Sequence, residues 1–364
     1  PATQGSKLYS VLPADGVGDF NFSRNTGATR INKDGLIETV AVGKSRLNYP
    51  LIDGVVNGCP SHLLEPSRLQ LIQYSEDFSN AAWTKTRCTV LSNQAISPDG
   101  TLNATLMTAT DDDARIEETV GVLGTATTQS IYVKSATGSD VAGQIDFAGA
   151  DIVNFTANNE WQRIETTLTN LAISTRVRAR ITSSGDAIYI YGAQLEQGSY
   201  ATSYIPNYGT SAGITRSAET ANGAGDASTF NDSEGVLMAE ISALANDGTV
   251  RAISLNNGSV SNRISIRYNS TSNQIQYQYT SGGSVQVNIT SNVVDVKTPH
   301  KIAVKYKLND FELFIDGISR GTDLIGNVMP YGTLTNLDVN GSGVLDSFYG
   351  NTKQIQYFDS ALND

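Results

Sequence analysis

The residues of this chain that could do acid–base chemistry are clustered carboxylates. Asp111, Asp112 and Asp113 form one run, and Glu117 and Glu118 form a second. Glycoside hydrolysis needs two carboxylates that face each other across a cleft at about 5–9.5 Å. Successive residues of a strand point to opposite faces of its sheet, so neither run forms such a pair by itself. We interpret both runs as solvated loops.

Other catalytic signatures are weak in this sequence. His300 lies at the start of an expected strand, which favours a capping or surface role over that of a lyase base. The sequence contains no Gly-x-Ser-x-Gly elbow, no His-Glu-x-x-His helix and no phosphate loop. The chain is therefore predicted not to be an enzyme, and a polysaccharide depolymerase is kept as an alternative.

Aromatic side chains are better candidates for a site, because a sugar ring stacks on an aromatic face while planar polar groups fix its hydroxyls. The chain has 16 Tyr, 10 Phe and 2 Trp, a balance that suits partly exposed aromatic surfaces. For each aromatic candidate, packing within a sheet is the favoured alternative, since aromatic residues are common in strands. The candidates are Tyr132, Gln144, Trp161, Arg163, Tyr189 and Tyr191 in one strand series, and Arg267, Tyr277 and Tyr279 in another.

Ca²⁺ is the one cofactor that the sequence suggests. This cation prefers carboxylate, amide and carbonyl oxygens. Asp111 with Asp113, or Asp338 with Asp346, could supply such oxygens, although no EF-hand spacing is present. No other cofactor is expected.

The cysteines and histidines do not form a metal motif. Cys59, Cys88, His62 and His300 are too few and too scattered for a zinc site. We expect Cys59 and Cys88 to be small buried thiols, and a single bridge between them stays open as an alternative.

The charge balance limits the possible partners. Lys and Arg total 25 against 36 Asp and Glu, a formal net charge of −11. Binding to nucleic acid needs a basic face, so a nucleic-acid partner is not expected. The acidic surface is also expected to disfavour anionic polymers unless cations bridge them. No stretch approaches the ~18 apolar residues of a membrane helix, so membrane insertion is not expected.

Composition divides the chain into four segments. Residues 1–75 hold many Gly and Pro breakers and predict an extended arm, which lays isolated strands on its own chain or on another subunit. Residues 76–208 alternate apolar and polar positions, as in 127–134 and 187–195, and predict a β-sandwich. Residues 209–229 are rich in Gly, Ser, Ala and Thr and predict a linker. Residues 230–364 carry a second strand series and predict a second sandwich.

Three stretches resemble tail and appendage proteins of tailed bacteriophages. The first combines ATRI at 28–31, SRLNY at 45–49 and LLEPSR at 63–68 with YSEDFSNAAW at 74–83. It departs from the usual pattern at Ser45, where the family commonly has Pro, and at Leu69-Gln70, where Thr-Asn is common. The second, 191–206, is similar to the closing strand of carbohydrate-binding-module-like jelly rolls. The third, 300–306 with 314–317 and 348–362, is similar to the last strands of laminin-G or concanavalin-like sandwiches.

The resemblance implies a fold, a location and partners. The fold is all-β: an N-terminal arm at 1–75, a jelly roll at 76–208, a linker at 209–229 and a concanavalin/laminin-G-like sandwich at 230–364. The protein would be a virion appendage subunit, a tail fibre, spike or head fibre, attached to other virion proteins through its N-terminal region. It would bind a bacterial surface glycan as a homo-oligomer, a trimer by resemblance. A ligand-free structural connector is the alternative.

Overall fold

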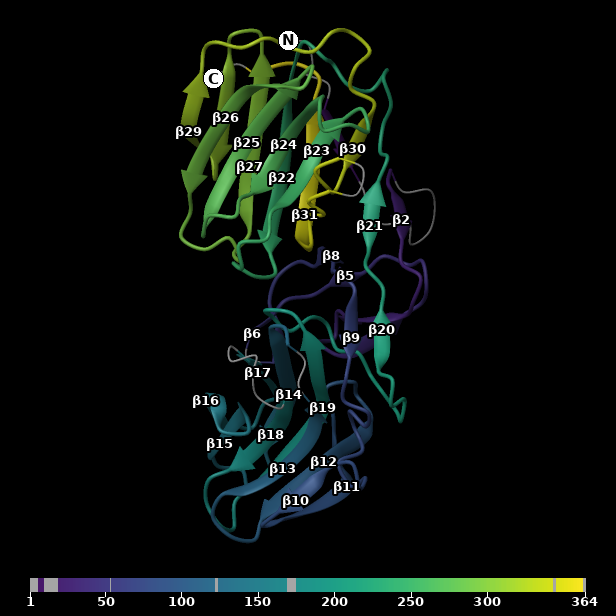
Figure 1. The fold of residues 1–364 in the computed structure, drawn as a ribbon, viewed down its shortest axis with the longest axis vertical. Coiled ribbons are helices and arrows are strands. Elements are labelled where there is room, and N and C mark those ends of the chain that lie inside the picture. Colours follow the sequence, from purple (N-terminus) through teal and green to yellow (C-terminus); the bar gives the residue numbers. More distant parts are fainter. Residues whose placement is uncertain are drawn as a thin grey trace.

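The computed structural model describes residues 6–9, 19–52, 54–121, 124–168, 175–342 and 345–362. These residues form 31 strands and no helix, so the predicted all-β class is confirmed. Figure 1 shows two stacks of sheets, one above the other, with short strands of the arm between them. Within those described ranges, no helix is long and apolar enough to cross a bilayer.

The lower stack in Figure 1 is the first sandwich. One sheet has the order β11-β12-β19-β14-β17 and the other the order β10-β13-β18-β15-β16. Apolar side chains from both sheets fill the space between them, including Met107, Ile131 and Ile190 from one and Ile116 and Ile145 from the other. The strands are β10 Thr84–Thr86, β11 Cys88–Ile96, β12 Leu102–Ala109, β13 Ala114–Gly121, β14 Thr127–Ser135, β15 Val141–Phe147, β16 Ala150–Ala157, β17 Gln162–Leu168, β18 Thr175–Ile181 and β19 Ala187–Gln197.

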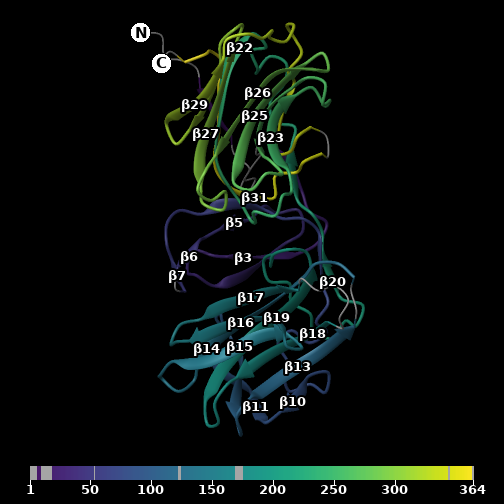
Figure 2. The same ribbon diagram turned by 60° about the vertical axis from the view of Figure 1, so that its left-hand side comes forward.

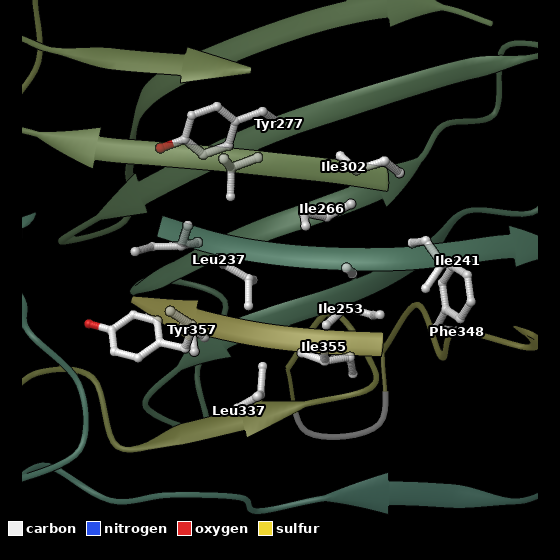
Figure 3. Packing of buried hydrophobic residues seen from close by; sticks show 14 of the residues in the cluster. Leu237, Ile241, Ile253, Ile266, Tyr277, Ile302, Leu337, Phe348, Ile355 and Tyr357 are labelled. Carbon is white, nitrogen blue, oxygen red and sulfur yellow. The ribbon is translucent and has the colours of Figure 1, made fainter. Parts of the chain in front are cut away.

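The upper stack is the second sandwich. Its sheets have the orders β29-β28-β27-β22-β31 and β26-β25-β24-β23-β30, and the first of these is extended by strands of the arm. Figure 3 shows its core, where Leu237, Ile302 and Ile355 of one sheet meet Ile253 and Ile266 of the other. The strands are β22 Glu234–Ala243, β23 Arg251–Asn256, β24 Arg263–Tyr268, β25 Gln274–Ser281, β26 Ser284–Asn292, β27 His300–Lys307, β28 Phe311–Ile315, β29 Ile318–Asp323, β30 Asn336–Asp338 and β31 Gly350–Phe358.

The arm pairs with both sandwiches of its own chain. β1 and β8 lie beside β31, and β5 lies beside β8, so strands from the two ends of the sequence share one sheet. β9 pairs with β19 of the first sandwich. The arm strands are β1 Ser6–Tyr9, β2 Asn21–Ser23, β3 Ala28–Ile31, β4 Ile37–Val40, β5 Leu47–Asn48, β6 Leu51–Ile52, β7 Val55–Val56, β8 Ser61–Leu64 and β9 Arg68–Gln70.

The segment predicted as a linker, 209–229, pairs with strands of the arm. This segment contains β20, Ile214–Arg216, which pairs with β9, and β21, Thr220–Asn222, which pairs with β2. Its Arg216 and Glu219 side chains are buried, which anchors the segment. We call residues 19–72 and 200–224 together the waist, and Figure 2 shows β3 and β5 of the waist between the two sandwiches.

The two cysteines are free thiols. Cys88 is half-buried, whereas Cys59, in the connection before β8, is exposed. The expectation of a buried thiol is therefore wrong for Cys59, because its connection runs over the surface of the waist.

Gly350 sets how closely β31 approaches β22. A Cβ at this position would overlap the carbonyl oxygen of Ser242 and lie 2.6 Å from Cε1 of Phe348. Gly350→Ala is therefore expected to lower the free energy of unfolding by about 1–3 kcal/mol, measured by urea denaturation. The control is Gly27→Ala, because a Cβ there meets only the Val40 carbonyl oxygen at 3.8 Å. Equal effects from the two variants would contradict the steric explanation.

Candidate functional site

Five charged residues from distant parts of the sequence meet inside the waist. Arg46 donates to Glu219 at 2.9 Å and pairs with Glu65 at 2.8 Å. Arg24 pairs with Glu219 at 2.7 Å, and Arg216 pairs with Glu65 at 2.6 Å. Burial by itself would raise the pKa of Glu65, but the charges of Arg216 and Arg46 lower it to about 2. Glu65 is therefore charged at neutral pH, and the ion cluster fixes the arm against the segment after β19.

A first cavity, of about 180 Å³, borders the ion cluster through Glu65. The arm supplies Arg30 and Asn48 to its wall, the first sandwich supplies Tyr132 and Arg163, and the second sandwich supplies Leu244 and Asn351. The cavity thus lies where the arm and both sandwiches meet. Two of the residues predicted to bind glycan, Tyr132 and Arg163, are brought together here.

Arg163 is held in this wall by neutral partners. Its guanidinium carbon lies 5.4 Å from the centre of the Tyr132 ring, and it donates to the Thr202 carbonyl at 2.7 Å and the Ser130 hydroxyl at 2.9 Å. No carboxylate of the described residues forms an ion pair with it, and its Nε has no hydrogen-bond partner there. Tyr132 therefore presents its ring to Arg163 rather than to a sugar.

A second cavity, of about 340 Å³, adjoins the first, because Asn48 and Asn351 line both. Asn48 Oδ1 accepts the Ile31 N–H at 2.8 Å, and Asn351 Oδ1 accepts the Ser61 hydroxyl at 2.9 Å. These bonds orient the two amides and leave their NH₂ groups unengaged by the described residues. We call the two cavities together the waist cleft. Its second half is lined mainly by polar side chains, including Lys297 and Lys353.

An apolar cavity of about 430 Å³ lies on the other side of Thr29 and Tyr204. Residues 26–29, 204–206 and 214–216 form most of its wall. The guanidinium of Arg216 in this wall is already engaged by Glu65 and the Pro66 carbonyl. The cavity therefore offers few free polar groups, and the waist cleft is better suited to a sugar.

The prediction that a sugar stacks on the ring is wrong for three residues, because their rings are buried. Tyr277 and Tyr279 are 0% exposed and lie in the core of the second sandwich, where each hydroxyl bonds to backbone. Tyr191 is 2% exposed and packs against Tyr132 and Tyr204 under the arm. The alternative that the sequence favoured, packing of the rings against neighbouring side chains of the sheets, fits all three better.

The remaining predicted residues are half-buried, and none of them lines the waist cleft. Trp161 donates from Nε1 to the Ile96 carbonyl at 3.0 Å, and Gln144 donates to Asn154 at 2.8 Å. Arg267 pairs with Asp346 at 3.1 Å in the second sandwich. Tyr189 lies in β19 with part of its ring exposed. The structure therefore does not bring these four residues into one site.

The predicted Ca²⁺ ligands are already engaged. Asp113 is bonded by Arg180 and Arg115, and Asp111 lies 4.0 Å from Arg87. Asp346 is bonded by Arg267, and the buried Asp338 accepts the Gly223 N–H and the Asn256 amide. In the part of the chain that the structure describes, no three His, Cys, Asp or Glu side chains converge. Binding of Ca²⁺ stays a prediction.

Two carboxylates converge elsewhere, at Glu76 and Asp99. The Tyr191 hydroxyl lies 3.2 Å from Glu76 and 3.1 Å from Asp99, and the Asn103 amide reaches both. Burial raises the pKa of Glu76. Burial by itself would raise the pKa of Asp99 as well, but hydrogen bonds from Thr101 and Ser97 lower it. Neither carboxylate lines the waist cleft or the apolar cavity, so this pair holds tyrosines in place rather than facing a bond across a cleft.

Sequence reasoning missed Asn48, Asn351 and Arg30 in the cleft. Asn48 stands in the stretch 45–49 that carries part of the phage-protein resemblance, which was a usable signal. Asn351 also stands in a resembling stretch, 348–362, but nothing there set it apart as a site residue, because asparagine is common throughout this chain.

No family model and no curated protein matches this chain. Among solved structures, it is similar to a sialidase carbohydrate-binding module of Ruminococcus gnavus bound to α2,3-sialyllactose, with 14% identity over 39% of this chain and 89% of the other, and a TM-score of 0.33. It is also similar to a β-glucanase of Bacillus licheniformis, with 16% identity, 41% and 80% coverage and a TM-score of 0.31. Two domains of the mouse laminin α1 chain match with 10% identity, 83% and 92% coverage and a TM-score of 0.28.

Proposed function

We propose that this chain is a non-enzymatic glycan-binding protein and that the waist cleft is its binding site. The observation that carries the proposal is the wall shared by the two cavities, where Asn48 and Asn351 hold oriented, unengaged amide groups close to Arg163. Amides and guanidinium groups in fixed positions are the polar groups that select sugar hydroxyls.

The biological setting is proposed from the sequence. The motifs at 28–83 and 191–206 resemble phage tail proteins, which supports a virion appendage that presents the cleft to a bacterial surface glycan. The first cavity is smaller than the ~300–1,000 Å³ of pockets for drug-sized ligands, so this half of the cleft would hold about one sugar ring, and a single copy would bind weakly. Useful adhesion then needs several copies, which supports the proposed trimer.

A ligand-free connector is the second candidate function. It is favoured by the ion cluster, which joins the arm to the segment between the two sandwiches without needing a ligand. The two functions differ in one observable. A connector would not bind cells through their sugars, whereas the glycan-binding protein would.

The test is binding of the fluorescently labelled protein to a panel of bacterial strains before and after periodate oxidation of their surface sugars. We expect binding to be lost on oxidation. A parallel measurement in EDTA tests whether the binding needs Ca²⁺. No binding to any strain by protein verified as folded, or binding that survives periodate, would contradict the proposal and favour the connector.

Asn351→Ala is expected to weaken binding to those cells about tenfold, because it removes one oriented amide from the wall common to both cavities. The dissociation constant would be measured by titration of the labelled protein on one strain. Asn159→Ala is the matched control, since Asn159 is exposed in the connection between β16 and β17 and outside the cleft. An unchanged constant for Asn351→Ala would place the site elsewhere.

A further inference from the structure

The charges around the waist cleft differ in sign from those of the chain as a whole. The chain has a formal net charge of −11. The ion cluster behind the cleft, however, contains three guanidinium groups, Arg24, Arg46 and Arg216, and only two carboxylates, Glu65 and Glu219. All five side chains are at most 3% exposed. Each arginine has a carboxylate partner, but three positive and two negative charges leave the ion cluster with a net charge of +1.

The wall of the first cavity adds a positive charge that has no carboxylate partner among the described residues. Arg163 is half-buried, and its partners are a carbonyl, a hydroxyl and an aromatic ring, none of which carries a negative charge. Arg30, also in this wall, is paired with Glu38 at 3.0 Å and adds no net charge. A charged group removed from water is costly unless an opposite charge compensates it. An anion in the cavity would therefore compensate the positive charge of Arg163.

The second cavity continues this pattern toward solvent. Lys297 and Lys353 both line it, and each lies near one carboxylate, Asp295 at 3.7 Å and Glu240 at 3.6 Å. Such solvent-exposed pairs are weak, so both ammonium groups can turn to an anionic ligand. Like-charged groups at both ends of one cleft suit a ligand with negative charges along its length. A polysaccharide with one acidic group per repeat fits this spacing better than a single small anion.

We propose that the waist cleft is selective for acidic glycans, with a sugar carboxylate, sulfate or phosphate held by Arg163 in the first cavity and a following residue of the polymer near Lys297 and Lys353. This inference rests on the proposed glycan-binding function and specifies its ligand class. It reverses the expectation from net charge, because the field at the cleft is set by groups within a few ångströms, whereas more distant surface charges are screened over about 8–10 Å.

The experiment is a glycan array that carries uronate-containing, sialylated, sulfated, phosphorylated and neutral glycans, probed with the full chain. We expect binding confined to the acidic members, and the pattern among them identifies which acidic group is read. Equal binding to acidic and neutral members, or binding to neutral members alone, would overturn the selectivity and leave the proposed function standing. Binding to no member would overturn both.

Variants tie the selectivity to named residues. Arg163→Gln is expected to weaken binding to the best acidic glycan at least tenfold, while Arg320→Gln removes an equal charge from an exposed position on β29 and is expected to have no effect. Because Arg163 is half-buried, the double variant Lys297→Gln/Lys353→Gln serves as a second test at exposed positions, with an expected loss of at least threefold. Equal losses from Arg320→Gln and the cleft variants would show a general charge effect and overturn the assignment.

Discussion

Replacing Glu219 with glutamine is expected to lower the free energy of unfolding by about 3–5 kcal/mol. Glu219 accepts from Arg24 at 2.7 Å and from Arg46 at 2.9 Å, and it also accepts the Glu65 backbone N–H at 2.9 Å. Its side chain is 0% exposed. Glutamine has nearly the same shape but no charge, so Glu65 would be left as the one carboxylate facing three buried guanidinium groups.

The measurement is urea denaturation of the variant and of the parent protein. The matched control is Glu234→Gln, which removes a carboxylate that pairs with Lys307 at 3.2 Å at a largely solvated position. Exposed pairs contribute about 0–1 kcal/mol, so this control should change little. A loss for Glu219→Gln no larger than for Glu234→Gln would show that the ion cluster does not stabilise the waist.

The strands of the sandwiches could be predicted from alternation, but their burial could not. In β19, Ile188 and Ile190 point into the core as the period of two requires. Tyr191 lies on the opposite face and was therefore a candidate for a stacking surface. Ile37 of the arm covers that face together with Tyr204, and cover by a segment as distant in sequence as the arm leaves no local pattern. The same reason applies to β14, in which eight of nine residues are buried.

The waist was the part least accessible to sequence reasoning. Its ion cluster joins Arg24, Arg46 and Glu65 of the arm to Arg216 and Glu219 of the segment 209–229. The Gly- and Ser-rich composition of that segment gives no sign of these contacts, which only the folded structure shows. The resemblance did mark two of these residues, because Arg46 and Glu65 lie in its motifs at 45–49 and 63–68. Those motifs thus encode the buried ion pairs of the waist. The cleft itself depends on three segments meeting, so only Tyr132 and Arg163 of its wall were found.

The second large effect is expected from pH, through His62 on β8. The His62 ring is buried, packs edge-on against Phe22 at 5.9 Å, and has no hydrogen-bond partner on either nitrogen. Burial, assisted by the charge of Arg46, lowers its pKa to about 3. The unfolded chain binds a proton at His62 below about pH 6.5, whereas the folded chain does so only near pH 3. Folding stability therefore falls as the pH falls through this window, by about 1.4 kcal/mol per pH unit.

Glu118 acts in the opposite direction and must be separated from His62. Burial raises the pKa of Glu118 to about 7, so between pH 4.5 and 7 the folded chain holds a proton that the unfolded chain releases. Its contribution to stability is present at low pH and is lost as the pH rises through that window. Glu65, with a pKa of about 2, loses its contribution only below pH 4.5. The slope of the parent protein between pH 5 and 7 is thus the difference of two opposing effects.

His62→Phe isolates the histidine. A phenyl ring fills the same site beside Phe22 without titrating, and any change in packing is the same at every pH. The difference in unfolding free energy between His62→Phe and the parent is expected to grow in favour of the variant by about 1.4 kcal/mol per unit from pH 6.5 to pH 5. Glu118→Gln is the control. It removes the opposing effect of Glu118, so the unfolding free energy of this variant should fall more steeply with falling pH than that of the parent. A constant difference between His62→Phe and the parent over this range would mean that His62 binds its proton equally in the folded and unfolded chains. β8 is one of the two arm strands that pair with β31, so a confirmed slope would show that this junction between the waist and the second sandwich is weakened by acid.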